Sequence, residues 1–146
     1  MAKCVRDAMT RNVRTATPAQ SLTDAARMMK SEDAGAIPVV EDGRLVGIVT
    51  DRDIVVRAVA EGIDPSMLLI SDVVTRPVIA VMPGQDLEEA LALMAQYQVR
   101  RLPVVEEDDE VVGILAQADI ALNVKEKRAG ETLEEISKPT PSAAWA

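Results

Sequence analysis

The sequence predicts a mixed α/β (α+β) fold made of two copies of one β-α-β-β-α unit. Three observations support it: an internal repeat, helical stripes of apolar residues, and paired short apolar runs. Val5 aligns with Ile70 and Gly47 with Gly113, so the repeat offset grows from 65 to 66 residues. Each copy alone leaves an apolar face exposed to water. Two copies packed with pseudo-twofold symmetry would cover each other's apolar face. The repeated segments are Val5–Val13 with Ile70–Val78, Ile37–Glu41 with Leu102–Glu106, Val46–Ile48 with Val112–Ile114, and Asp53–Ile54 with Asp119–Ile120.

Each copy predicts an amphipathic helix behind a capping residue. Ser21 precedes Asp24 by three residues, the spacing of a capping box, and Asp86 precedes Glu89 in the same way. Apolar residues then recur at i, i+3, i+4 and i+7. They are Leu22, Ala25, Ala26 and Met29 in the first copy and Leu87, Ala90, Leu91 and Met94 in the second.

A pair of strands is predicted after each of these helices. In the first copy Ala36–Val40 and Leu45–Val49 flank Asp42-Gly43, a dipeptide that favours a tight hairpin turn. Leu102–Val105 and Val111–Leu115 are the corresponding runs of the second copy. A closing helix is predicted from Thr50 to near Gly62, since glycine suits a left-handed C-terminal cap.

These boundaries predict a first repeat over residues 5–64 and a second over residues 65–124, joined around Ile63-Asp64-Pro65. Residues 125–146 form a charged C-terminal extension. Lys125–Ile136 is compatible with a helix, and the following residues, with Trp145, are expected to form a mobile tail.

Composition argues against several classes of function. A net charge of −8 and 1% aromatic residues are unlike a nucleic-acid-binding surface. No run approaches the ~18 apolar residues of a membrane span, and the N-terminus lacks a signal-peptide core, so a cytoplasmic protein is expected. The chain contains no histidine, which excludes Ser-His-Asp and Cys-His catalysis and most zinc sites. No catalytic residue, metal site or cofactor is therefore predicted. Cys4, without a partner, is more typical of an incidental thiol than of a reactive one.

The first candidate site is Thr50-Asp51-Arg52-Asp53, where a strand enters a helix. Ligands of α/β units gather at the carboxyl ends of strands, and the Asp53 carboxylate can accept two hydrogen bonds from a ribose diol. Thr-x-x-Asp is also a capping box, which on residue type alone is the commoner role of an acid at this position. The second copy keeps Asp119 but has Ala116 in place of the threonine, which favours a functional role for the acid.

Arg100-Arg101 and the two proline segments are the other candidates. Adjacent guanidinium groups suit phosphate oxygens, although a solvated pair at a strand start is the commoner arrangement. The first copy has Gly35-Ala36 at these positions. The third candidate is the pair of proline segments, Ile37-Pro38 and Leu102-Pro103. A proline there can end the strand pairing and expose carbonyl groups beside an apolar surface on which a flat base could stack. Alternatively, each proline is only a structural residue of an edge strand.

The repeated h-P-V-V, V-G-I-[VL] and T-D-R-D-I or A-Q-A-D-I segments resemble the cystathionine-β-synthase (CBS) domain. Two such domains in tandem form a Bateman module. The resemblance covers roughly Val5 to Val124, and the chain is most similar to small stand-alone two-CBS proteins. The resemblance implies two units packed through their sheets, often as a homodimer, and binding of AMP, ADP, ATP or S-adenosylmethionine. Its ribose-binding pattern G-h-h-T-x-x-D matches Gly47–Asp53 in full, whereas Gly113–Asp119 lacks the hydroxyl.

The resemblance thus implies one main ligand site and one weaker site. The main site would use Thr50 and Asp53 for the ribose, Ile37 and Pro38 for the base, and Arg100 and Arg101 for the phosphate. The weaker site would retain Pro103 and Asp119. The leading hypothesis is a cytoplasmic sensor of adenine nucleotides. The alternatives are an S-adenosylmethionine binder and an interaction protein with vestigial clefts and a protein partner of unknown identity.

Overall fold

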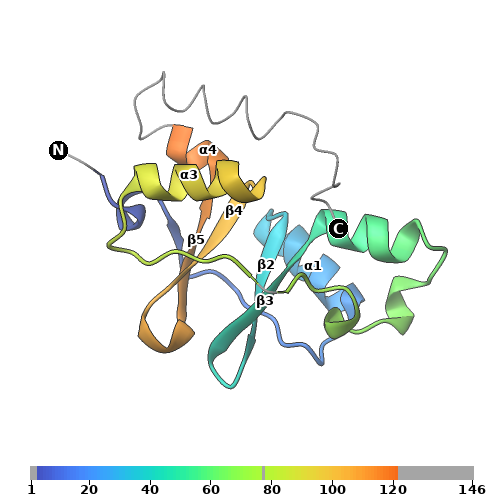
Figure 1. Ribbon diagram of the computed structural model, residues 1–146. Coiled ribbons are helices and arrows are strands. Elements are labelled where there is room, and N and C mark those ends of the chain that lie inside the picture. Colours follow the sequence, from blue (N-terminus) through green and yellow to red (C-terminus); the bar gives the residue numbers. More distant parts are fainter. Residues whose placement is uncertain (1–2, 77, 122–146) are drawn as a thin grey trace. The chain divides into compact units, whose positions relative to one another are not determined.

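The computed structural model describes residues 3–76 and 78–121 (Figure 1). The first repeat has the predicted order of strand, helix, strand, strand, helix. In the described part of the second repeat an isolated bridge at Thr75 takes the place of the predicted opening strand, and the other elements follow in the predicted order. The predicted extension at residues 125–146 lies outside the described residues. The α-helices are α1 (Leu22–Glu32), α2 (Asp51–Ile54), α3 (Leu87–Tyr97) and α4 (Gln117–Ala121), and the strands are β1 (Thr10–Arg11), β2 (Ala36–Glu41), β3 (Arg44–Thr50), β4 (Arg101–Val105) and β5 (Val111–Ala116). A π-helix, η2 (Val55–Val59), continues α2. The short 3-10 helices are η1 (Val5–Asp7), η3 (Pro65–Met67), η4 (Ile70–Asp72) and η5 (Glu107–Asp109).

The chain folds into two compact units that do not coincide with the sequence repeats. Unit 1 contains the described residues 3–12, 79–108 and 112–121, and unit 2 contains residues 13–76, 78 and 109–111. Each repeat therefore contributes its opening segment to the unit built by the other repeat. The boundaries drawn at residues 64 and 65 describe the sequence repeat, and the compact units cut across them.

The exchanged segments occupy equivalent sheet edges. In unit 2, β2 pairs antiparallel with β3, and Ile48 of β3 pairs with Thr75 from the start of the second repeat. In unit 1, β4 and β5 lie side by side, and Ile114 of β5 pairs with Thr10 of β1. Thr10 and Thr75 are equivalent positions of the repeated motif, so the two sheets are completed in the same way.

The glycine of each V-G-I segment lies where the exchanged segment crosses. A Cβ on Gly113 would lie 2.7 Å from the Thr10 carbonyl oxygen, and one on Gly47 would lie 3.0 Å from the Thr75 carbonyl oxygen. Both distances are at or below the tightest contacts that Cβ atoms make. The repeated glycine is thus required by close backbone approach.

Each unit has its own hydrophobic core of aliphatic side chains, with α1 packed against β2 in unit 2 and α3 against β4 in unit 1 (Figure 1). The predicted stripe of α3 is confirmed, since all four of its members are buried. In α1 the prediction for Ala26 is wrong: Ala26 is exposed and Met28 is buried instead. Met28 follows Ala25 by three residues, so the buried face of α1 is centred near Ala25 and Met29 and leaves Ala26 beyond its edge.

The turns and caps follow the local sequence closely, with one exception. Asp42 and Gly43 have φ of 53° and 78°, the left-handed pair that a type I′ hairpin requires. Gly62 has φ of 72° at the end of the helical segment, as predicted. Ser21 caps α1 by accepting the Asp24 N–H at 3.0 Å. Asp86 makes no side-chain cap on α3, so that prediction is wrong.

Asp64 fixes the turn between the two repeats. Its carboxylate accepts hydrogen bonds from the backbone N–H and the hydroxyl of Ser66, at 2.9 and 2.8 Å. These two bonds favour the ionised form and hold the pKa of Asp64 below its ordinary value of 3.8. The linker therefore carries a fixed negative charge at neutral pH.

Candidate functional site

The Thr50–Asp53 segment forms a reciprocal capping box at the carboxyl end of β3. Thr50 N–H donates to Asp53 Oδ2 at 2.9 Å, and Asp53 N–H donates to Thr50 Oγ1 at 3.1 Å. Thr50 has the extended backbone of an N-cap, with φ −118° and ψ 161°. The sequence alternative of a capping role for Asp53 is therefore confirmed.

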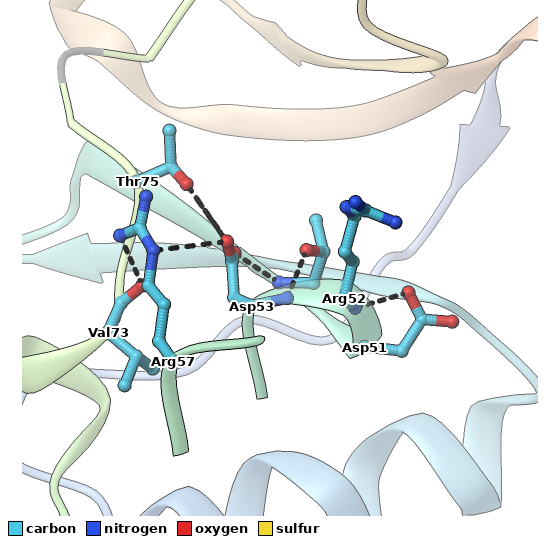
Figure 2. A network of polar contacts seen from close by, with 7 residues as sticks. Asp51, Arg52, Asp53, Arg57, Val73 and Thr75 are labelled. Atoms are coloured by element: carbon cyan, nitrogen blue, oxygen red, sulfur yellow. Dashed lines mark hydrogen bonds and ion pairs between the residues drawn. The ribbon is translucent and has the colours of Figure 1, made fainter. Parts of the chain in front are cut away.

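Asp53 is also the centre of a polar cluster that extends beyond its own helix (Figure 2). The Thr75 hydroxyl donates to Asp53 Oδ1 at 3.3 Å and to Oδ2 at 3.5 Å. Arg57 Nε lies 3.9 Å from Asp53 Oδ1, and Arg57 Nη1 donates to the Val73 carbonyl at 3.0 Å. Only 4% of Asp53 is exposed, and it is the one charged residue buried in the described chain. A buried carboxylate needs such partners, because desolvation without them is costly.

Thr75 and Arg57 are the site residues that sequence reasoning missed. Thr75 belongs to the repeated opening motif, but the repeat alone does not tell which sheet that motif joins. Arg57 follows Asp53 by four residues, a spacing that places the two side chains on one helical face. That spacing was readable from the sequence.

Asp119 has the same capping function without the threonine. Ala116 N–H donates to Asp119 Oδ2 at 3.2 Å, although Ala116 has no hydroxyl to return the bond. The opening motifs repeat this half-box, since Asp7 accepts the Cys4 N–H at 2.9 Å and Asp72 accepts the Leu69 N–H at 2.8 Å. The missing threonine is therefore weak support for a functional role of Asp119, because the acid caps the helix without that hydroxyl.

Arg100 and Arg101 lie in unit 1, where β4 begins, whereas Thr50 and Asp53 lie in unit 2. The Arg100 carbonyl accepts the Gln117 N–H at 2.8 Å, as Gly35 accepts the Asp51 N–H at 3.0 Å in unit 2. Arg100 is exposed and Arg101 is half-buried. Neither guanidinium group forms an ion pair with a described residue. Their role toward a phosphate stays a prediction.

The proline segments are integrated into the sheets. Ile37 is only 1% exposed and belongs to the core of unit 2. The Pro38 carbonyl accepts the Ala16 N–H at 2.9 Å, and the Pro103 carbonyl accepts the Val81 N–H at 3.0 Å. The expectation that these carbonyl groups are exposed is therefore wrong. Both carbonyl groups accept hydrogen bonds in short parallel bridges, which pair Ala16 with Val39 and Val81 with Val104.

Other features of the described residues limit the chemistry. No group of three or more His, Cys, Asp or Glu side chains within 3–76 and 78–121 is arranged to hold a metal ion. None of the helices in that part of the chain combines the length and the apolar character that a membrane crossing requires. Cys4 is a free, half-buried thiol.

A separate open hollow of about 460 Å³ lies on unit 1, and none of the predicted site residues lines it. Its lining mixes one cation with two carboxylates and an apolar edge. The lining residues are Arg6, Met82, Pro83, Gly84, Gln85, Glu106 and Glu107. Opposite charges on an open surface do not define one ligand chemistry, so Asp53 and its partners remain the better-defined candidate.

Comparison with known proteins gives one family and several full-length relatives. The family model of the CBS domain matches residues 5–59 and again residues 70–126. The chain is 44% identical to the CBS domain-containing protein YhcV of Bacillus subtilis, over 91% of this chain and 94% of that protein. It is 35% identical to hypoxic response protein 1 of Mycobacterium tuberculosis, over 95% and 97% of the two chains.

A solved structure extends the similarity to a liganded protein. The CBS domain pair of MJ0100, in complex with 5′-methylthioadenosine and S-adenosyl-L-methionine, matches with a TM-score of 0.78 and 28% identity. The match covers 87% of this chain and 99% of that one. Both ligands carry an adenosyl group with a ribose diol.

Proposed function

Because the chain belongs to the CBS domain family, with one CBS domain in each repeat, we propose that it is a non-catalytic regulatory module that binds an adenosyl ligand. AMP, ADP and ATP are the leading candidates, and S-adenosylmethionine is the alternative. The proposal is carried by the Thr50–Asp53 pair at the carboxyl end of β3, together with a similar domain pair that is liganded by two adenosyl compounds. A carboxylate beside a hydroxyl at a strand end suits a ribose diol.

The two repeats are not equivalent as ligand sites. Thr50 and Asp53 supply both a hydroxyl and a carboxylate, whereas the second repeat supplies Asp119 beside Ala116. We therefore expect one strong site per chain, with a weak or empty second site involving Pro103. Ile37 is a core residue, so the proposed contacts with the base use the surface around Pro38 rather than the Ile37 side chain.

Calorimetry with AMP, ATP, S-adenosylmethionine and 5′-methylthioadenosine tests the proposal. Binding is expected with a stoichiometry near one ligand per chain. Absence of both binding heat and thermal stabilisation at millimolar ligand would exclude the proposal. Equal occupancy of two sites would overturn the expected asymmetry.

Substitution of both Arg100 and Arg101 by alanine tests the predicted phosphate contacts. Hydrogen bonds to charged groups contribute about 1.5–3 kcal/mol, so the affinity for AMP is expected to fall ten- to a hundredfold. 5′-Methylthioadenosine has no phosphate and is the matched control, because its affinity should not change. An equal loss for both ligands would assign the arginines a structural role.

The alternative of an interaction protein has specific support. Asp53 is almost fully buried and Asp119 has a capping role, so both acids have structural uses without a ligand. Under this alternative the clefts are vestigial, and substitution of Arg100 and Arg101 by alanine leaves partner binding unchanged.

We further propose that the protein forms a homodimer. Val55 and Val59, four residues apart on one helical face, are each 56% exposed. A second copy of the chain would cover this apolar face. Val59→Glu is expected to shift the sedimentation of the protein from dimer to monomer. Gln96→Glu adds the same charge at an exposed position of α3 and should leave the dimer intact. A dimeric Val59→Glu variant would exclude this face.

A further inference from the structure

We propose that Thr75 and Arg57 are positioning residues of the ligand site, which hold the Asp53 carboxylate in a closed cluster that a ligand must open. This inference rests on the proposed function. It identifies the residues that set the ligand affinity and the segment that responds to binding.

The accessibility of Asp53 is the first argument. A ribose diol requires two acceptor positions on the carboxylate, yet only 4% of Asp53 is exposed. The carboxylate also contacts Thr75, by a hydrogen bond, and Arg57, by an ion pair, and both residues lie outside the Thr50–Asp53 capping box. A ligand therefore cannot reach the carboxylate until this part of the cluster moves.

The distances indicate which contact yields. The Thr50 N–H bond to Asp53 is short, at 2.9 Å, and closes the capping box. The Thr75 hydroxyl is shared between the two carboxylate oxygens at 3.3 and 3.5 Å, and Arg57 Nε lies at 3.9 Å, beyond hydrogen-bond distance. The Thr75 bond is thus the weaker of the two hydrogen bonds. A ligand hydroxyl would replace Thr75 while the cap persists.

Arg57 connects the cluster to the backbone of the exchanged segment. Its Nη1 donates to the Val73 carbonyl at 3.0 Å, so one guanidinium group contacts both Asp53 and the strand edge. The second repeat has Asn123 at the equivalent position, which cannot make this charged contact. The sequence therefore has an arginine at this position in the first repeat only, as it has the Thr-x-x-Asp pair.

The exchanged segment gives the cluster a regulatory consequence. The Thr75 N–H donates to the Ile48 carbonyl at 3.0 Å, and the Ile48 N–H donates to the Thr75 carbonyl at 3.4 Å. These two backbone hydrogen bonds hold Thr75 against β3, so this pairing is held by few bonds. The chain enters unit 1 at Ile79, soon after Thr75. Displacement of the Thr75 hydroxyl thus alters the segment that leads directly from unit 2 into unit 1. A ligand that favours the open cluster shifts this equilibrium by its differential affinity.

Thr75→Val tests the inference, with Thr75→Ser as the matched control that restores the hydroxyl. Valine removes the competing donor at almost constant volume. The expected result is a three- to tenfold lower Kd for AMP and for S-adenosylmethionine, together with a lower Tm of the unliganded protein. Thr75→Ser should restore both values. Hydrogen exchange of the Val73 and Thr75 amides should accelerate in Thr75→Val and, on ligand binding, in the wild type.

Each other outcome is decisive. An unchanged Kd with a lower Tm would show that Thr75 is only structural, and a weaker affinity would show that Thr75 contacts the ligand instead of competing with it. If no variant binds either probe, the proposed function fails. The cluster itself is then judged on the unliganded protein. Equal Tm and exchange rates in the wild type, Thr75→Val and Thr75→Ser would overturn it.

Discussion

Gly113→Ala is expected to lower the free energy of unfolding by about 2 kcal/mol, within the range of about 1–3 kcal/mol found for overpacked sites. The added Cβ would lie 2.7 Å from the Thr10 carbonyl oxygen and 2.9 Å from Met9 Sδ. The sulfur can move with its flexible side chain, but the carbonyl belongs to the β1–β5 pairing and cannot rotate away. The substitution should therefore separate β1 from β5. Urea unfolding would measure the loss, and faster hydrogen exchange at Thr10 and Arg11 would locate it.

Gly84→Ala is the matched control in the same unit. Its Cβ would meet only Arg6 Nη2, at 3.2 Å, which is the free end of a long side chain. Replacement of glycine by alanine also restricts the unfolded chain, which by itself stabilises by about 0.4–1 kcal/mol. Gly84→Ala should consequently be neutral or slightly stabilising. If Gly113→Ala is as stable as this control, the exchanged pairing of β1 with β5 is not part of the folded protein.

Asp53→Ala is expected to lower the free energy of unfolding by about 2–3 kcal/mol. It removes the acceptor of the Thr50 N–H, a loss of about 0.5–2 kcal/mol for a cap, and leaves the Thr75 hydroxyl without its partner. The Arg57 contact adds little, because that side chain is 31% exposed and well solvated. Under the proposed function, the variant also loses binding of AMP.

Asp119→Ala provides the comparison in the other repeat. Asp119 is half-buried and accepts the Ala116 N–H at 3.2 Å, so its removal should cost only about 0.5–1 kcal/mol. Chemical denaturation of the two variants measures the difference. Equal destabilisation would contradict the special burial of Asp53. Unchanged AMP affinity in a folded Asp53→Ala protein would assign this acid to capping alone.

The candidate site shows how far residue patterns reach. Thr-x-x-Asp at a strand end predicted both the cap and the candidate ligand contact at Asp53, because both depend on residues three positions apart. The burial of Asp53 depends on Thr75, which is 22 residues away along the chain. No local pattern encodes such a contact. The same limit explains Pro38, whose carbonyl bonds to Ala16 on an edge that the sequence did not reveal.

The sequence by itself determined the repeat, the α/β class, the helix stripes, the type I′ hairpin at Asp42-Gly43 and the CBS family. These features depend on periodicity, turn chemistry and short motifs, which act over a few residues. Only the tertiary structure decided that the opening segments at Thr10 and Thr75 exchange between units, and that Asp53 is enclosed by Thr75 and Arg57. Either sheet offers such a segment an edge of the same pattern, because the two copies resemble each other. Gly47 and Gly113 leave space for such a segment in both sheets, so the choice between them is visible only in the long-range backbone pairing.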